Sequence, residues 1–235
     1  MKALILSAGK GIRMGDQVIT TPKVMLPLLG KPLLQHQIEH LKKFEVNEVC
    51  INTHYLPEKI TGYFGDGNNF GVKIHYSYEP ELLNTAGALH NFKKILNKTF
   101  ILVYGDVFNL LNFDDMLRYH KKNKGIATLA IRKTDHPLDS DIVQIGKNNK
   151  IVHVVHKPGN LDYGDLGNVA IYILEPKIYN YLPESASDFI KDVFPRALQK
   201  GENLYGYMIQ EYAKDIGTPQ RFAEVTKMLQ KMHFV

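Results

Sequence analysis

The strongest constraint on the fold of this chain is a regular alternation of short apolar runs and longer amphipathic runs through its first half. The run at 2–7 is largely apolar, which is typical of a strand buried on both faces of a sheet. Segment 32–44 instead carries apolar residues at helical spacing and has Pro32 at its start. Strands that alternate with helices predict an α/β fold, here a Rossmann-like, mixed but mostly parallel sheet flanked by helices. The further strands are expected at 48–53, 72–78 and 100–106, and the further helices at 57–64, 85–96 and 113–123.

The second half of the sequence has a different pattern, in which strand-like stretches follow one another directly. A turn rich in glycine and asparagine at 146–150 divides the stretch 141–157 and predicts a hairpin there. We therefore expect a smaller antiparallel extension within one domain that spans residues 1–235. The helix expected at 113–123 has a lysine-rich end at 120–125, which we interpret as solvated and stopped by a glycine. The other expected elements are strands at 125–133 and 167–174 and helices at 187–200 and 218–232.

Composition and charge exclude several classes of protein. The chain has 235 residues and a net charge of +5, but its lysines are scattered, so a nucleic-acid face is not indicated. No run of 18 apolar residues occurs, so no membrane span is expected. The single cysteine, Cys50, excludes an internal disulfide and fits a reducing compartment, for which we expect the cytoplasm.

The stretch SAGKGIRMG at 7–15 follows the first apolar run and is the first candidate site. Gly9 and Gly11 leave backbone N–H groups bare enough to cradle phosphate oxygens, and Lys10 and Arg13 add positive charge. The spacing fits neither a P-loop nor a dinucleotide fingerprint, because Met14 stands where the fingerprint needs glycine. A tight turn after a buried strand is the alternative that these residues leave open.

Three charged residues elsewhere extend this candidate site. Lys23 follows Pro22, which stiffens the segment and can hold the lysine over the glycine loop. Asp106 and Asp215 each follow an expected strand, and carboxylates from two segments suit Mg²⁺. The alternatives are a solvated lysine and aspartates that only cap helices or turns.

Taken together, these motifs resemble the sugar-1-phosphate nucleotidylyltransferase family. The family pattern A-G-x-G-x-R, followed by P-K-x-M-L-P, reads here as AGKGIR and PKVMLP, and NTAGAL, YGD, HKP, GNVAIYIL and KDIGTP follow in family order. The mannose- and heptose-1-phosphate guanylyltransferase branch is the most similar. The resemblance implies transfer of a nucleoside monophosphate from an NTP to a sugar 1-phosphate, with Mg²⁺, and without nucleic acid or membrane as partner. Family members often carry a C-terminal left-handed β-helix of hexapeptide repeats, but the sequence contains no such repeat, so we expect none here, and a homodimer stays open.

The resemblance also implies roles for individual residues. Arg13 and Lys23 would be catalytic, neutralising charge on the α-phosphate and the leaving pyrophosphate, and Asp106 and Asp215 would bind Mg²⁺. The implied nucleotide-binding residues are Leu6, Ala8, Gly9, Lys10, Gly11, Glu79, Asn84, Thr85 and Gly87. The implied sugar-phosphate residues are Asp141, His156, Lys157 and Asn168. Because the attacking phosphate oxygen is already ionised, positioning and electrostatics suffice, and no general base is needed.

Several positions depart from the family pattern. Ile12 replaces a threonine and Asn84 replaces a glycine. His156 replaces a glutamate and Asp141 a glycine on the sugar side, so we expect a sugar other than glucose.

The choice of base depends on Glu79. A carboxylate only accepts hydrogen bonds and can take both N1–H and N2–H₂ of guanine, which favours GTP. The alternative for Glu79 is a surface acid in a loop. Uridylyl or thymidylyl transfer and a non-catalytic nucleotide-sugar sensor are the other functions considered. A nicotinamide dehydrogenase is disfavoured, because strand 48–53 ends in Asn-Thr without a ribose-binding acid.

Overall fold

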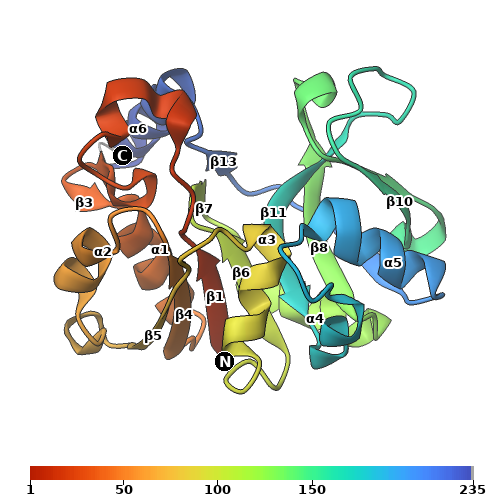
Figure 1. The fold of residues 1–235 in the computed structure, drawn as a ribbon. Helices are drawn as coiled ribbons and strands as arrows, with labels where there is room; N and C mark the ends of the chain where they lie inside the picture. Colours follow the sequence, from red (N-terminus) through yellow and green to blue (C-terminus); the bar gives the residue numbers. More distant parts are fainter. Residues whose placement is uncertain (234–235) are drawn as a thin grey trace. The chain divides into compact units, whose positions relative to one another are not determined.

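The computed structural model describes residues 1–233, and these form two compact units (Figure 1). The first unit comprises Met1–Leu82, Val103–Leu111 and the segment from Glu211 onward. The second unit comprises Leu83–Leu102 and Asn112–Gln210. Neither unit is continuous in sequence. Residues 234–235, the end of the domain expected at 1–235, lie outside the described part of the chain.

The first unit contains the parallel sheet that the sequence predicts. β1 (Lys2–Leu6) pairs in parallel with β4 (Glu48–Thr53), which pairs in parallel with β5 (Lys73–Tyr78). Beyond β1 lies the end of β6 (Phe100–Tyr104), after which the N–H of Gly105 donates to the carbonyl of Leu6 at 2.8 Å. The side chains at the centre of β1 are fully buried, as a strand covered on both faces requires.

Three α-helices and two small antiparallel strand pairs complete the described part of the first unit. The helices are α1 (Leu33–Lys42), α2 (Pro57–Phe64) and α6 (Pro219–His233). β2 (Pro27–Leu28) pairs with β3 (Lys31–Pro32), and β7 (Val107–Asn109) pairs antiparallel with β13 (Ala213–Asp215). A separate apolar cluster fixes the segment after the glycine loop; its buried members are Met14, Val18, Leu26, Leu28, Leu33, Phe108, Ile216, Val225 and Leu229.

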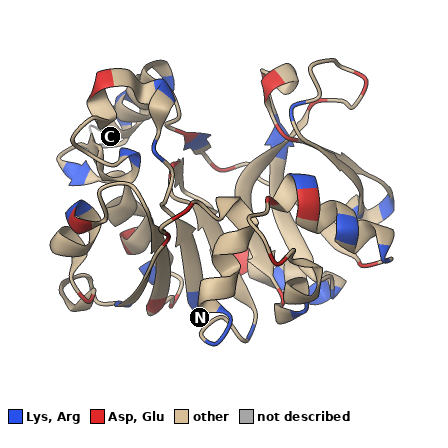
Figure 2. Cartoon of the chain, viewed as in Figure 1, with Lys and Arg blue, Asp and Glu red and all other residues tan. Residues whose placement is uncertain are grey.

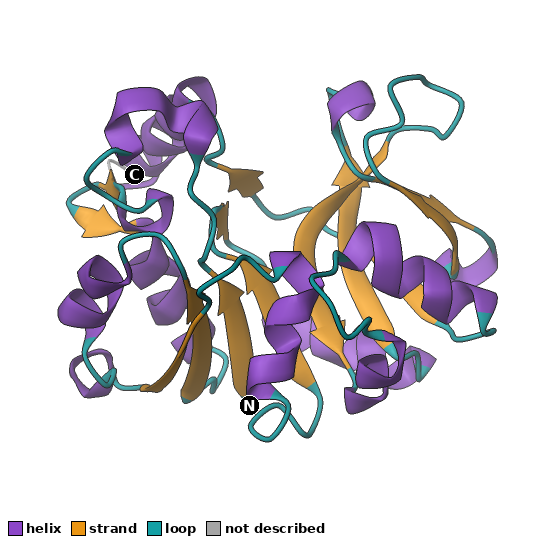
Figure 3. Ribbon diagram, viewed as in Figure 1, coloured by secondary structure: helices purple, strands orange, loops and turns teal. Residues whose placement is uncertain are grey.

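The second unit contains the predicted antiparallel extension (Figure 3). β11 (Leu166–Leu174) pairs antiparallel with β8 (Ala127–Lys133) and with β9 (Ile142–Ile145). β9 and β10 (Ile151–Val155) form the hairpin expected around 146–150. The sequence did not indicate β12 (Leu204–Met208), which pairs in parallel with β8.

The helices of the second unit differ from prediction in two places. Segment 85–96 is not one α-helix: α3 (Asn84–Gly87) continues as a 3-10 turn over Ala88–Phe92, whose three-residue period turns both Leu89 and Phe92 into the core. Segment 187–200 begins with a π-helical turn at Phe189–Val193 and becomes α5 (Phe194–Gln199), because Pro195 has no N–H to continue the regular ladder.

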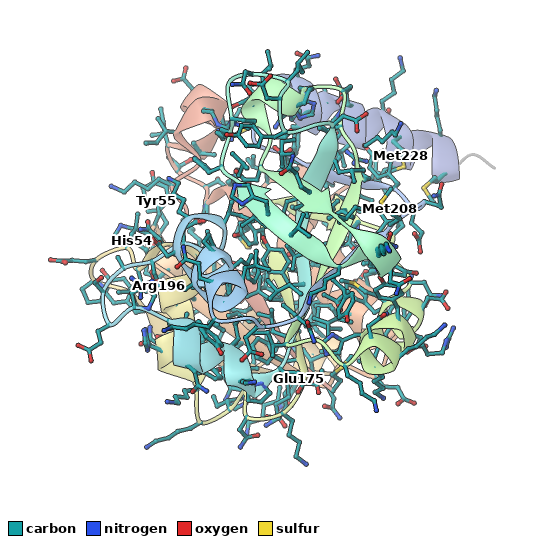
Figure 4. The ribbon with its side chains drawn as sticks, turned by 90° about the vertical axis from the view of Figure 1, so that its right-hand side faces the viewer. His54, Tyr55, Glu175, Arg196, Met208 and Met228 are labelled. Carbon is teal, nitrogen blue, oxygen red and sulfur yellow. The ribbon has the colours of Figure 1, made fainter. Side chains whose placement is uncertain are left out.

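The end of α4 (Phe113–Asn123) is solvated as expected at Lys121, Lys122 and Lys124, but not at His120. His120 is buried, with Nδ1 2.8 Å from the hydroxyl of Thr128 and Nε2 3.0 Å from the carboxylate of Glu175. Glu175, labelled in Figure 4, follows directly after β11. The residue that ends the helix in the left-handed conformation is Lys124 rather than Gly125.

Within residues 1–233, no helix has the length and apolar character that crossing a membrane requires.

Candidate functional site

The glycine loop begins where β1 ends. Ser7 is buried, and its N–H donates to Oδ1 of Asn52 at 2.8 Å. A Cβ at Gly9 would meet nothing within 4 Å, so the space beside the loop is open. Gly11 has a φ of +69°, and a Cβ there would lie only 2.9 Å from Cβ of Lys23. The loop therefore needs glycine at 11 both for its conformation and for the close approach of the lysine segment.

The residues after the loop form 3-10 turns at Ile12–Val18. Gly15 interrupts them with a φ of 59° and a ψ of −137°, a conformation that glycine alone adopts readily. Ile12 is 81% exposed, so isoleucine in place of the family's threonine leaves no buried polar group without a hydrogen-bond partner at this position. Met14 and Val18 point the other way, into the apolar cluster.

Lys23 and Asp106 form an ion pair in the first unit. Nζ of Lys23 lies 2.5 Å from Oδ2 of Asp106, and both side chains are mostly buried. Asp106 directly follows Gly105, where a Cβ would lie 2.5 Å from the carbonyl oxygen of Leu6. The carboxylate thus stands at the carboxyl ends of β1 and β6, where α/β sheets bind their ligands.

The pairing of β7 with β13 brings the second predicted acid to the same place. Asp215 lies opposite Val107, and the N–H of Ile216 donates to the carbonyl of Asp106 at 2.8 Å. The two aspartates, 109 positions apart in sequence, are therefore neighbours across one strand pair.

Asp215 is held by a residue that sequence reasoning missed. Nη1 of Arg221 donates to both carboxylate oxygens of Asp215 at 2.8 and 2.9 Å, and the N–H of Gly217 donates at 2.9 Å. Burial acts to raise the pKa of Asp215, but the bonds and charge of Arg221 outweigh it and hold the pKa below its usual value. A basic residue in the first turn of the helix after KDIGTP was the available signal.

The guanidinium of Arg13 lies near this acid as well. A Cβ at Gly217 would lie 2.6 Å from Oδ1 of Asp215 and 3.0 Å from Nη2 of Arg13. The first unit therefore brings together all four charged residues for which a catalytic or metal-binding role was predicted: Arg13, Lys23, Asp106 and Asp215.

The donor set of this cluster suits magnesium better than a transition metal. Among residues 1–233, no group of three or more His, Cys, Asp and Glu side chains could hold a metal ion. Two carboxylates nevertheless fit Mg²⁺, which is commonly bound by one or two carboxylates together with substrate phosphates and waters. Their partial exposure, 23% for Asp106 and 32% for Asp215, leaves them accessible to such an ion.

The side chain of Glu79 lies in the interior of the first unit rather than on its surface. It is 1% exposed, and its Oε1 accepts a hydrogen bond of 2.8 Å from the amide of Asn52. Asn52 in turn accepts from the N–H of Ser7, so the carboxylate supports the start of the glycine loop through this amide. Glu79 is not a surface acid in a loop, because the polypeptide buries it.

In the second unit, α3 explains one departure from the family pattern. Asn84 has a φ of +60°, and asparagine is among the few residues other than glycine that adopt this conformation readily. The hydroxyl of Thr85 donates to Oδ2 of Asp188 at 2.7 Å. The N–H groups of Ala86 and Gly87 donate to the carbonyl of Ser187.

The predicted sugar-phosphate residues of the second unit are partly connected. Nδ1 of His156 lies 2.7 Å from Oδ1 of Asp141, and the N–H of Asn168 donates to the carbonyl of Asp141 at 2.8 Å. Burial raises the pKa of the Asp141 carboxyl, and the charge of His156 opposes this shift. Lys157 pairs instead with Asp139, at 3.0 Å.

The amide of Asn168 is bonded at both ends within its own strand. Its Nδ2 donates to the hydroxyl of Tyr172 at 2.7 Å, and its Oδ1 accepts from the N–H of Ala170 at 3.1 Å. Ala170 has a φ of +61° where the register of β11 against β8 shifts, so a bulge sets the direction of this segment.

A model of the nucleotidyl transferase family matches residues 2–232, and so runs through both units. The chain belongs to the nucleotidyl transferase family. Among curated proteins it is 32% identical over 233 residues to a UTP–glucose-1-phosphate uridylyltransferase of Synechocystis sp., with 92% of this chain and 60% of that protein covered. It is 29% identical over 223 residues to a mannose-1-phosphate guanylyltransferase of Mycobacterium tuberculosis, with 94% of this chain and 62% of that protein covered. The chain thus spans about three-fifths of the length of these relatives.

Solved structures confirm the fold of this nucleotidyl transferase. HddC from Yersinia pseudotuberculosis, complexed with GMP-PN, matches with a TM-score of 0.80 at 23% identity, and the match covers 97% of this chain and 99% of that one. Within this fold, Lys and Arg are spread over the elements of both units beside Asp and Glu, as the scattered sequence positions predict (Figure 2).

Proposed function

We propose that this nucleotidyl transferase is a sugar-1-phosphate nucleotidylyltransferase that transfers a nucleoside monophosphate and releases pyrophosphate. The observation that carries the proposal is the cluster of Arg13, Lys23, Asp106 and Asp215 beside the open glycine loop. Cations and hard oxygen ligands around bare backbone N–H groups suit a triphosphate and its metal.

The cluster needs to perform no proton transfer, because the attacking oxygen of a sugar 1-phosphate is already ionised at neutral pH. N–H groups around Gly9 and Gly11 would orient the triphosphate, and Arg13 and Lys23 would neutralise the charge that develops on the transferred and leaving phosphates. Asp106 and Asp215 would hold Mg²⁺, which when bound supplies further charge neutralisation of the phosphates. The other nucleotide contacts proposed are those of Leu6, Ala8, Lys10, Asn84, Thr85 and Gly87.

The second unit would bind the sugar phosphate through Lys157 and the sugar through Asp141, His156 and Asn168. We propose a mannose- or heptose-type sugar, because the bonded pair of Asp141 and His156 replaces the family's glycine and glutamate. With Nδ1 engaged by Asp141, the imidazole of His156 offers only Nε2 to a hydroxyl group, whereas a glutamate offers two oxygens.

We propose GTP as the nucleotide, with UTP as the alternative. The mannose-1-phosphate guanylyltransferase relative supports GTP, and the UTP–glucose-1-phosphate uridylyltransferase relative supports UTP. The burial of Glu79 weakens the argument from guanine's donors, since one carboxylate oxygen already accepts from Asn52. In Glu79→Gln the amide oxygen can still accept from Asn52, so the variant keeps this bond while it removes the charge and replaces the other acceptor oxygen by a donor. We expect its ratio of GTP to UTP turnover to fall, and an unchanged ratio would exclude a base-reading role.

The activity is tested by measuring pyrophosphate release from four NTPs, each with glucose, mannose and heptose 1-phosphates and Mg²⁺. We expect pyrophosphate release from GTP with mannose or heptose 1-phosphate. In Lys23→Met the rate of release should fall about 100- to 1000-fold, because a residue that stabilises transition-state charge is lost. Lys31→Met is the matched control, since Lys31 pairs with Glu39 away from the cluster. No release from any pair of substrates, or equal activity of the two variants, would contradict the proposal. Cytoplasmic location and a homodimer stay predictions.

A further inference from the structure

Asp188, to which the sequence analysis assigned no role, lies between two predicted binding segments of the second unit. Its Oδ2 accepts the hydroxyl of Thr85 at 2.7 Å, and the N–H of the next residue, Phe189, donates back to that hydroxyl at 3.1 Å. The Thr85 hydroxyl is therefore both a donor and an acceptor. Its direction is set by a segment about a hundred positions later in the chain.

The carboxylate of Asp188 is itself held rigidly. Its Oδ1 accepts from the N–H groups of Ile190 at 2.8 Å and Lys191 at 3.3 Å, which caps the π-helical turn before α5. The N–H of Asp188 donates to the carboxylate of Asp192 at 2.7 Å. With one oxygen on the cap and the other on Thr85, the side chain is constrained at both oxygens.

Backbone hydrogen bonds fasten the same two segments together. The N–H of Ser187 donates to the carbonyl of Leu83 at 3.0 Å, and the carbonyl of Ser187 accepts from Ala86 at 2.9 Å and Gly87 at 3.2 Å. A Cβ at Gly87 would lie 3.1 Å from Cβ of Leu83 and 3.4 Å from the nitrogen of Ser187, so glycine permits this approach. Figure 1 shows the chain that leads into α5 passing beside α3.

The segment that Asp188 begins also contacts the strand that carries a predicted sugar-binding residue. The ring of Phe189 packs against that of Tyr172, with 5.4 Å between the ring centroids, and the hydroxyl of Tyr172 accepts a hydrogen bond from the amide of Asn168 at 2.7 Å. Asp141 bonds His156 through its side chain and Asn168 through its carbonyl.

We propose that Asp188 is a positioning residue that, through Thr85 on one side and the packing of Phe189 on Tyr172 on the other, holds the nucleotide-binding segment 84–87 in a fixed position relative to the sugar-phosphate residues Asn168 and Asp141. The proposal rests on the proposed function, and it assigns Asp188 no contact with substrate. It requires that loss of the Asp188–Thr85 bond weakens the binding of both substrates together.

Asp188→Asn separates this role from helix capping. Asparagine caps helices as well as aspartate does, so Oδ1 can still accept from Ile190 and Lys191. Its amide nitrogen cannot accept the hydroxyl of Thr85 and can only donate to the hydroxyl oxygen, so the bond from Thr85 to a charged acceptor is lost. Thr85→Val removes the hydroxyl from the other partner at constant shape, and Thr85→Ser restores it.

Steady-state kinetics of these variants are the test. We expect the KM for NTP and the KM for sugar 1-phosphate to rise together, about ten- to 100-fold, in Asp188→Asn and in Thr85→Val, as the loss of a hydrogen bond to a charged group implies. The double variant should be no worse than either single one, and Thr85→Ser, which keeps the hydroxyl, should raise both KM values less than Thr85→Val does.

The matched control is Asn112→Ala, which removes the cap of α4 in the same unit, where Oδ1 of Asn112 accepts from Asp114 and Asp115. It should lower thermal stability without changing either KM. Unchanged KM values in Asp188→Asn, or additive effects in the double variant, would overturn the positioning role. If wild type shows no turnover, the proposed function fails, and calorimetric binding of GTP and UTP then compares the variants. Equal binding, or none to wild type, would also overturn the role.

Discussion

Gly105 separates β6 from Asp106 and is packed too tightly to accept a side chain. A Cβ there would lie 2.5 Å from the carbonyl oxygen of Leu6 and 2.9 Å from both the hydroxyl of Ser7 and Cγ1 of Val24. The nearest of these atoms belongs to the backbone of a central strand and cannot rotate away. In Gly105→Ala, either β1 or the turn that carries Asp106 must therefore move.

The size of the effect follows from this overlap. Inserting one methyl group into a well-packed interior costs about 1–3 kcal/mol. At 2–4 °C per kcal/mol for a chain of this size, the melting temperature should fall by about 2–12 °C. The same shift displaces Asp106, and a misplacement of about 1 Å is enough to lower turnover about 100-fold.

Gly62→Ala is the matched control for this prediction. Gly62 lies within α2, and a Cβ there would meet nothing within 4 Å. Since alanine is the better helix former, Gly62→Ala should gain about 0.5–1 kcal/mol. Thermal unfolding of both variants, followed by circular dichroism beside wild type, should give shifts of opposite sign. A Gly105→Ala variant that melts at or above the wild-type temperature would refute the packing argument.

Three further predictions concern single residues. Arg221 holds the pKa of Asp215 below its usual value, so this pair stabilises the fold above about pH 4, and the stabilisation is lost as pH falls through the lowered pKa. In urea unfolding, Arg221→Met should be less stable than wild type at pH 6, and the difference in unfolding free energy should shrink in acid. A gap that is constant with pH would contradict the pairing. Burial raises the pKa of Cys50 to about 12, so the thiol should react with a disulfide reagent at pH 8 only after unfolding. Rapid labelling of the native protein would contradict the burial of this thiol. Asn84→Gly should leave the stability nearly unchanged, whereas Asn84→Val should cost about 1–2 kcal/mol in urea unfolding, because valine, unlike glycine, is strained at a φ of +60°. Equal unfolding midpoints of the two variants would contradict this strain.

The parallel sheet of the first unit was predictable because β1 is buried on both faces and reads as a short apolar run, and because strand-like runs alternate with helical ones. The positions of Asp106 and Asp215 near strand ends were predictable from the same alternation. The partners of these residues were not, since Arg221 reaches Asp215 only through the pairing of β13 with β7.

The sequence also did not predict which single polar residues are buried. Glu79 and His120 lie in stretches that look solvated, yet each is buried against a specific partner from another element. Such partners come from tertiary contacts between distant segments, which local periodicity does not encode. The left-handed conformation of Lys124 next to Gly125 was missed because glycine is the default expectation there.

The division of the chain into interleaved segments has a consequence for its synthesis. The second unit has all of its residues once Gln210 has been added, whereas the first unit, which starts at Met1, still lacks β13 and α6. The unit begun first on the ribosome is therefore the one completed last, against the usual N-terminal-first order of domain folding. After Asp106 is incorporated, more than a hundred further residues must be translated before Asp215 and Arg221 are present. A nascent chain stalled before Glu211 would contain Lys23 and Asp106 but not Asp215 or Arg221, so the cluster proposed to act on phosphates would stay incomplete until translation resumed.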